Sequence, residues 1–250
     1  MRIKYAKNLL KGNLCAAVMC VILPVIMYLT VKFAEQIIRR YFFPLYQADI
    51  REIIILLVAI LLHFMLMYPL IFAKKLCFYA NCTKKRIPLF GVFCCYGSLR
   101  SFCLAALTVL LKNTVTFLLC GIMILPSFWA VRLALLGGFD VCLQIAAVLL
   151  AISAVYFSAV IIYSLFLTEY IAVQTGKNPF YCMLMSIRLM RKNRSKLLLL
   201  KLKLLPYLLM CLGVIPIFYV LPLYSQTTAL FAHDIIFYSP LFVPASSTDI

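Results

Sequence analysis

Apolar residues in this chain come in long runs, and the short segments between the runs carry most of the charge. A helix needs about 20 mostly apolar residues to cross the hydrocarbon core of a bilayer. The runs lack the alternating segments of about 10 residues from which a membrane β-barrel is built. The pattern therefore predicts spanning helices at residues 14–31, 53–73, 102–131, 141–168 and 204–224.

The composition strengthens this prediction. Hydrophobic residues make up 66% of the 250 residues and charged residues only 12%, whereas soluble domains carry about 25% charged residues. A soluble fold of this length has too little interior to bury so much apolar surface. The predicted fold class is all-α: a single polytopic helical bundle over residues 1–250 with about five spans, or six if the region 102–168 divides differently.

Basic residues are concentrated on alternate connecting segments. Segments 1–13, 74–101 and 169–203 hold 18 of the 24 Lys and Arg residues, and the segments between them hold five. Six of the seven acidic residues sort the opposite way. Because cytoplasmic segments are enriched in Lys and Arg, these three segments and the N-terminus are predicted to be cytoplasmic. With five spans, the C-terminus would lie on the extracytoplasmic side.

The segment before the last run combines a helix start with a basic cluster. Asn178 and Pro179 suit the N-cap and first position of a helix, which would run along the cytoplasmic interface, partly covered by other spans. Anionic headgroups attract each nearby cation by about 1 kcal/mol, so the net charge of +17 requires no nucleic acid. The residues predicted to contact lipid headgroups or a docking partner are Arg188, Arg191, Lys192, Arg194, Lys196, Lys201 and Lys203.

Two ionisable residues fall within predicted spans, where such residues are candidates for function. His63 lies in the second run, and Lys112 lies in the third, beside Asn113 and one turn before Thr116. These four residues form a candidate polar site at mid-bilayer depth. Lys112 has an alternative place: if the true span is 113–131, Lys112 is an ordinary interfacial charge. His63 has one too, as a neutral imidazole bonded to a neighbouring helix.

Motifs for hydrolysis, nucleotide binding or dinucleotide binding are missing from the sequence. No catalytic residue, cofactor or metal site is therefore predicted, and the protein is not expected to be an enzyme. The 11 cysteines include Cys77, Cys82, Cys94 and Cys95 in one predicted connecting segment. Their spacing does not match a zinc knuckle, so they are predicted to be reduced thiols.

The last third of the chain resembles a known family. The stretches YSLFLTEYIAVQTGKNPF, SIRLMRKNRSK and LPLYSQTTALF follow one another between residues 163 and 231. They are similar in order to the C-terminal part of a bacterial membrane family called domain of unknown function 975. The matching positions are Tyr163, Ser164, Tyr170, Pro179, Ser186, Leu189, Met190, Pro222, Tyr224 and Phe231. The chain departs from the family pattern at Lys192, where a Gly is usual.

The resemblance implies a multi-pass protein of the bacterial plasma membrane and supplies no catalytic residue. The function expected from the sequence is that of a non-enzymatic accessory or scaffold component acting through its basic cytoplasmic face. Its partners would be anionic lipid headgroups, another membrane protein or further copies of itself. The alternative is a small transporter or lipid-handling protein with a polar cavity at His63 and Lys112.

Overall fold

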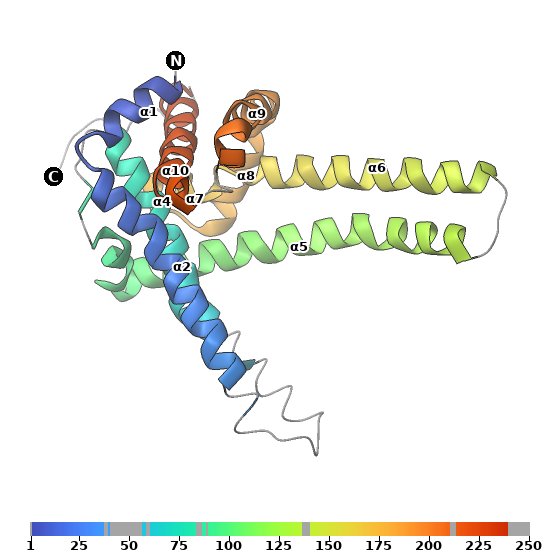
Figure 1. Ribbon diagram of the computed structural model, residues 1–250, viewed down its shortest axis with the longest axis horizontal. Coiled ribbons are helices and arrows are strands. Elements are labelled where there is room, and N and C mark those ends of the chain that lie inside the picture. The colour runs from blue at the N-terminus through green and yellow to red at the C-terminus, as the bar shows by residue number, and fades with distance from the viewer. Residues whose placement is uncertain are drawn as a thin grey trace.

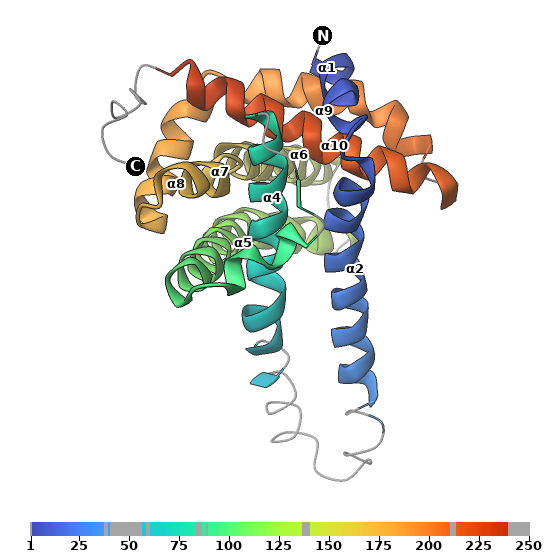
Figure 2. The same ribbon diagram turned by 90° about the vertical axis from the view of Figure 1, so that its left-hand side faces the viewer.

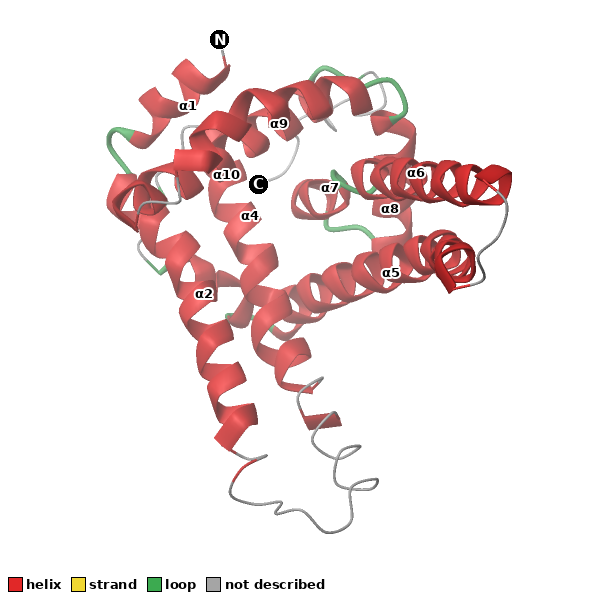
Figure 3. Ribbon diagram, turned by 45° about the vertical axis from the view of Figure 1, so that its right-hand side comes forward, coloured by secondary structure: helices red, strands yellow, loops and turns green. Residues whose placement is uncertain are grey.

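A computed structural model describes residues 2–37, 40, 57–58, 61–83, 87–88, 90–136, 141–210 and 214–239. Helices account for all the regular structure in these residues, and they contain no strand (Figure 3). The elements are α1 (Arg2–Leu10), α2 (Leu14–Ile37), η2 (His63–Met67), α4 (Tyr68–Cys82), η3 (Gly91–Tyr96), α5 (Leu99–Leu136), α6 (Val141–Ser164), α7 (Thr168–Thr175), α8 (Pro179–Met190), α9 (Arg194–Leu209) and α10 (Val214–Phe237). Residues 53–56 and 59–60 of the predicted second span lie outside the described part.

Two helical hairpins project from a common helical base. Helices α5 and α6 run side by side away from the other helices in Figure 1. Helices α2 and α4 form the second pair in Figure 2, with α10 crossing over one end of it. We call the remaining helices, α1 and α7 to α10, together with the adjoining ends of the two hairpins, the head.

The projecting hairpins expose large apolar side chains. In α5, Phe117 is 78% exposed and Ile122 is 63% exposed, and in α6 Val155 is 68% exposed. Surfaces of this kind are stable in lipid rather than in water. Within the described residues, three segments are long and apolar enough to cross a membrane: Leu14–Ala34, Leu99–Arg132 and Gln144–Thr175. The predicted class of helical protein is therefore confirmed, whereas the count of five spans is not.

The head has an apolar core around the second half of α10. Phe231 and Ile236 of α10 are fully buried, as are Leu10 of α1 and Phe78 of α4. A chain of side-chain amides beside this core joins the turn between α1 and α2 to α4 and α10. Asn13 donates to Asn81 at 3.2 Å, and Asn81 donates to the fully buried Gln226 at 2.8 Å.

Helix boundaries differ from the prediction at two places. The predicted span 204–224 falls on two helices, because α9 ends at Leu209 and α10 begins at Val214. Pro216 lies in the first turn of α10, where a missing backbone N–H costs no helical hydrogen bond. The second apolar run also continues as helix to Cys82, so that Lys74 and Lys75 belong to α4 rather than to a connecting loop.

The two ends of the described chain lie on the same side of the molecule. Arg2 in α1 donates to the carboxylate of Asp234 in α10 at 2.8 Å, and its guanidinium lies 5.0 Å from the ring centre of Phe231. The contact joins segment 1–13 to segment 225–250, which the five-span arrangement would put on opposite sides of the membrane. The orientation of the two ends stays a prediction.

The connection from α6 to α8 is built from three local features. Gly176 ends α7 in the left-handed conformation (φ 60°), and its N–H donates to the Ala172 carbonyl at 2.9 Å. Pro179 occupies the first turn of α8 as predicted, although Asn178 makes no capping hydrogen bond with its side chain. The buried Ser186 hydroxyl donates to the Ser164 carbonyl at 2.7 Å and accepts from the Leu167 N–H at 3.1 Å.

Candidate functional site

A fully buried carboxylate lies where α5, α7 and α4 meet. Glu169 of α7 has no exposed side-chain surface, and both of its oxygens are paired. Oε1 accepts from the Lys112 ammonium at 2.9 Å, and Oε2 accepts from the Lys75 ammonium. We call these three residues the charge cluster; with two ammonium groups and one carboxylate, it carries one excess positive charge.

The walls of the charge cluster are aromatic. Tyr170, the neighbour of Glu169, is buried, and the Lys75 ammonium lies 5.6 Å from the centre of its ring. Phe166 packs on the other side of Tyr170 with a ring separation of 5.6 Å. Burial lowers the pKa of Lys75 to about 8, since desolvation penalises its charged form more than Glu169 favours it. The cluster therefore holds charge in an environment of low polarity.

Next to the charge cluster lies a cavity of about 570 Å³, which we call the lysine cavity. It lies where α10 and α9 pack over the base of the hairpin formed by α2 and α4, the region seen in Figure 2. Lys74, Lys75 and Lys201 contribute its three cationic groups. The remaining walls are mainly apolar or aromatic, and they include Val21, Val25, Ile71, Phe78, Phe166 and Leu221.

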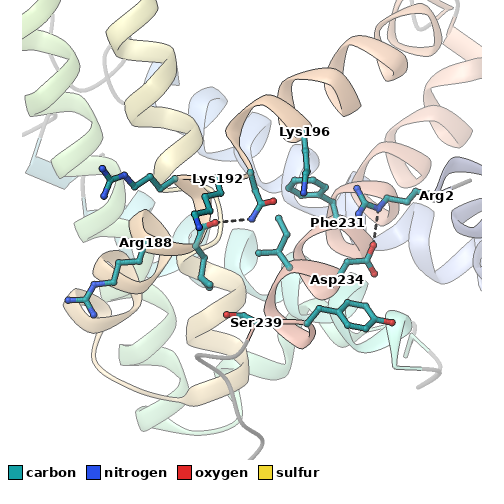
Figure 4. A pocket seen from close by; sticks show the side chains of 12 residues that line it. Arg2, Arg188, Lys192, Lys196, Phe231, Asp234 and Ser239 are labelled. Atoms are coloured by element: carbon teal, nitrogen blue, oxygen red, sulfur yellow. Dashed lines mark hydrogen bonds and ion pairs between the residues drawn. The ribbon is translucent and has the colours of Figure 1, made fainter.

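A second cavity, of about 720 Å³, opens between α8, the turn 191–193 and α10; we call it the basic cleft. In Figure 4, Arg188 and Lys192 lie along one side, and Lys196, Arg2 and Asp234 lie along the other. Arg191 also lines the cleft, and Leu189, Phe231 and Ile235 give it apolar surface. Five cationic residues thus share this cleft with one carboxylate, which already accepts from Arg2.

The structure separates the residues of the predicted mid-bilayer site. Lys112 joins Glu169, and Thr116 donates to the Lys112 carbonyl at 2.7 Å within the same helix. Asn113 is exposed on α5. The backbone of His63 begins η2, whereas its side chain lies outside the described part of the molecule. The carboxylate that meets Lys112 is Glu169, which lies one residue beyond the predicted fourth span 141–168.

The predicted docking residues divide into three groups. Arg188, Arg191, Lys192 and Lys196 line the basic cleft, and Lys201 lines the lysine cavity, where its ammonium lies 4.5 Å from the ring centre of Tyr163. Lys203 is exposed on α9 and lines neither cavity. Arg194 is half-buried, and its Nε has no hydrogen-bond partner within the described residues.

Three cysteines come together from separate elements. The thiol of Cys77 in α4 lies close enough to Cys20 of α2 and Cys94 of η3 for the three to influence one another's protonation. The hydrogen bond with Cys77 lowers the pKa of the Cys94 thiol, since it favours the thiolate. Among the described residues, no group of three or more His, Cys, Asp and Glu has the arrangement needed to hold a metal ion.

Several functional candidates were not found from the sequence. Lys74 and Lys75 were counted among the charges of a connecting segment, and Glu169 was not singled out in the basic segment 169–203. Arg2 and Asp234 were placed on opposite sides of the membrane. The sequence did contain a sign that Lys74 and Lys75 lie in a helix, because the stretch FAKKLCFYANC continues beyond the apolar run without Gly or Pro.

The described part of the chain is thus all-helical, with three helices able to cross a membrane, a buried charge cluster, the basic cleft and the lysine cavity. Comparison with known proteins found no match to this chain among family models, curated proteins or solved structures. The resemblance to the family of unknown function therefore stays a prediction.

Proposed function

We propose that this chain is a non-enzymatic accessory or scaffold component of the bacterial plasma membrane and that it acts through the basic cleft. The single observation that carries the proposal is the concentration of cations in that cleft. Arg188, Arg191, Lys192 and Lys196 have no ion-pair partner among the described residues. Their charge is thus available to an acidic surface on another molecule.

The side chains that the structure describes give further support to a role without catalysis. Glu169 and Asp234 are the two carboxylates whose side chains it places, and both are held by cations. A carboxylate bound in this way is a poor general base, because the neighbouring cation stabilises its deprotonated form. His233 packs between aromatic rings, with its ring 5.6 Å from Tyr79 and 5.6 Å from Phe237.

We infer that the membrane orientation places the head on the cytoplasmic side. Each hairpin would cross the bilayer and return, which gives four crossings, by α2, the helix ending at Cys82, α5 and α6. The basic segments 1–13, 74–101 and 169–203 belong largely to the head or to the hairpin bases, in agreement with the positive-inside rule. The Arg2–Asp234 pair supports a C-terminal segment on the same side as the N-terminus.

The pairing of Lys112 with Glu169 supports the same orientation. It brings Lys112 to the level of α7, at the base of the hairpin formed by α5 and α6. Residues 113–131 would then be the crossing part of α5, and Lys112 would mark the cytoplasmic boundary. This is the arrangement in which a buried Lys costs least, because a carboxylate and the headgroup region both lie within reach.

The proposal is tested by charge reversal on the basic cleft. The variant carries Arg188→Glu, Arg191→Glu, Lys192→Glu and Lys196→Glu, and Lys203→Glu on the exposed side of α9 is the matched control. Each tagged protein is extracted gently from its own host membrane and weighed by native mass spectrometry. We expect a stoichiometric partner protein with the wild type and with the control, and loss of that partner with the fourfold variant.

Two outcomes would contradict the proposal. One is a wild-type protein that carries only lipid, and the other is a partner that remains bound to the fourfold variant. Membrane insertion of the variant is checked by sedimentation with membranes after carbonate washing, because reversed charge can also disturb topology. Failure to insert calls for the milder Lys192→Gln and Lys196→Gln variant, which removes two cations without adding acid.

A further inference from the structure

We propose that the lysine cavity is a binding site for one anionic single-chain lipid, a long hydrocarbon chain that ends in a carboxylate. The site lies between α2, α4, α9 and α10 and is separate from the basic cleft. The proposal therefore goes beyond the accessory function and does not depend on it. It rests on the charge of the cavity, the nature of its walls and its size.

The cavity holds more positive charge than the protein neutralises. Lys74, Lys75 and Lys201 all line it, whereas the nearest carboxylate, Glu169, lies behind Lys75 and also serves Lys112. In the described part of the chain, Lys74 and Lys201 have no ion pair. Because an unpaired ammonium in an apolar setting is costly, an anionic group bound beside these lysines would be stabilised.

The pKa values of these lysines agree with a site that lacks a counter-ion for its cations. Burial lowers the pKa of Lys74 and of Lys201, as it does for Lys75. Each ammonium therefore gives up its proton more easily than a lysine in water. A bound carboxylate would reverse this effect by favouring the charged forms.

The walls around the lysines suit a hydrocarbon chain. Val21 and Val25 of α2 face the cavity together with Ile71 and Phe78 of α4 and Leu221 of α10. Tyr170, Tyr224 and Thr228 add hydroxyl groups to the lining. Mainly apolar walls with a few convergent polar groups are typical of small-molecule sites, and each methylene buried in such a site contributes about 0.8 kcal/mol.

The volume indicates one chain rather than two. At about 30 Å³ for each water molecule in the liquid, the cavity of about 570 Å³ has room for about 19 water-sized groups. A carboxylate with a long saturated chain has about that many heavy atoms, whereas a two-chain phospholipid has more than twice as many. The occupant of best fit is thus a long-chain fatty acid anion.

The test measures binding of radiolabelled palmitate to the full-length protein in a non-ionic detergent by equilibrium dialysis. Hexadecanol provides the same chain without the charge, and octanoate provides the charge with a short chain. We expect one saturable site for palmitate. Binding of both other probes should be weaker by about tenfold or more, since a charged hydrogen bond or several buried methylenes is each worth at least that factor.

Variants connect this binding to the cavity. The double variant Lys74→Gln with Lys201→Gln removes two cations and leaves the charge cluster intact, whereas Lys203→Gln removes an exposed cation from the same helix as Lys201. Val25→Trp fills the chain-binding part of the cavity from a half-exposed position. We expect the double variant and Val25→Trp to lose palmitate binding by about tenfold or more, and Lys203→Gln to keep it.

Three results would overturn the proposal: hexadecanol binding as tightly as palmitate, Lys203→Gln losing as much as the double variant, or no saturable site at all. Thermal unfolding in the same detergent shows whether each variant is folded. Should the double variant fail to fold, Val25→Trp and the comparison of probes on the wild type decide the question. None of these results bears on whether the basic cleft binds a partner protein, so the two proposals stand or fall separately.

Discussion

Glu169 is the single carboxylate of the charge cluster. It is fully buried and pairs with both Lys75 and Lys112, whose side chains are 24% and 21% exposed, respectively. Removing one partner of a buried ion pair leaves an uncompensated charge, which is more costly than exchanging the whole pair for apolar groups. The cluster is therefore vulnerable to a single neutral substitution that barely changes shape.

We predict that Glu169→Gln lowers the free energy of unfolding by about 3–5 kcal/mol, because two buried ammonium groups lose their anion. The measurement is chemical unfolding in detergent micelles, followed by circular dichroism. Lys112→Gln is the control, since it leaves the Glu169–Lys75 pair in place and should cost less. A Glu169→Gln protein as stable as the wild type would show that the lysines find other partners or lose their protons.

Part of the charge cluster could be predicted from single residues. The sequence placed Glu169 in the basic segment 169–203 and Lys112 in a candidate polar site. It could not indicate that both statements describe one cluster, because residues 112 and 169 are separated by the whole α5–α6 hairpin. Lys75, the third residue of the charge cluster, could be assigned to it only from the structure, in which α4 continues beyond the apolar run.

At the scale of elements, the short helices between α6 and α9 have sharply defined ends. The N–H of Gly176 closes the last hydrogen bond of α7, to Ala172, and the chain then turns away with a positive φ of 60°. Any residue with a Cβ pays about 1 kcal/mol or more for this conformation. The turn sets the path from α7, which carries Glu169, to α8, which lines the basic cleft.

We predict that Gly176→Ala lowers the free energy of unfolding by about 1 kcal/mol, since alanine disfavours the left-handed conformation. Chemical unfolding in detergent measures the change. Gly12→Ala is the matched control, because Gly12 also has no atom within 4 Å of an added Cβ but lacks a positive φ. Equal effects at the two positions would contradict the conformational explanation.

The helix periodicity and the proline positions predicted where α8 begins, and the structure agrees. They failed at the junction of α9 and α10, where the apolar run continues from Leu204 past Pro216 although the helix does not. Hydropathy alone cannot distinguish a spanning helix from two helices packed in a head, because both bury apolar residues.

At the scale of the whole molecule, the contact between α1 and the end of α10 determines the expected topology. In the proposed orientation, the Arg2–Asp234 pair calls for an even number of crossings. Four crossings in two hairpins would meet this condition and would keep the basic segments on one side.

We predict that a fluorescent protein fused after Ile250 folds and fluoresces in the cytoplasm, and that alkaline phosphatase at the same place is inactive. The complementary site is residue 140, between α5 and α6, where an inserted cysteine in a cysteine-free background should react with a membrane-impermeant thiol reagent. An active phosphatase after Ile250 would contradict the four-crossing arrangement and favour the predicted five.

The sequence by itself determined that the helices are surrounded by lipid and that the fold is helical. Long apolar runs with few charges are stable in lipid, and there they must form helices. The sequence also determined where the cations gather, because the positive-inside pattern is a property of segments rather than of contacts. Only the tertiary structure decided which charges meet. Glu169 with Lys75 and Lys112, Arg2 with Asp234 and the three lysines around one cavity are contacts between distant segments. Such contacts are fixed by how the helices pack in three dimensions, and no local pattern of residues encodes them.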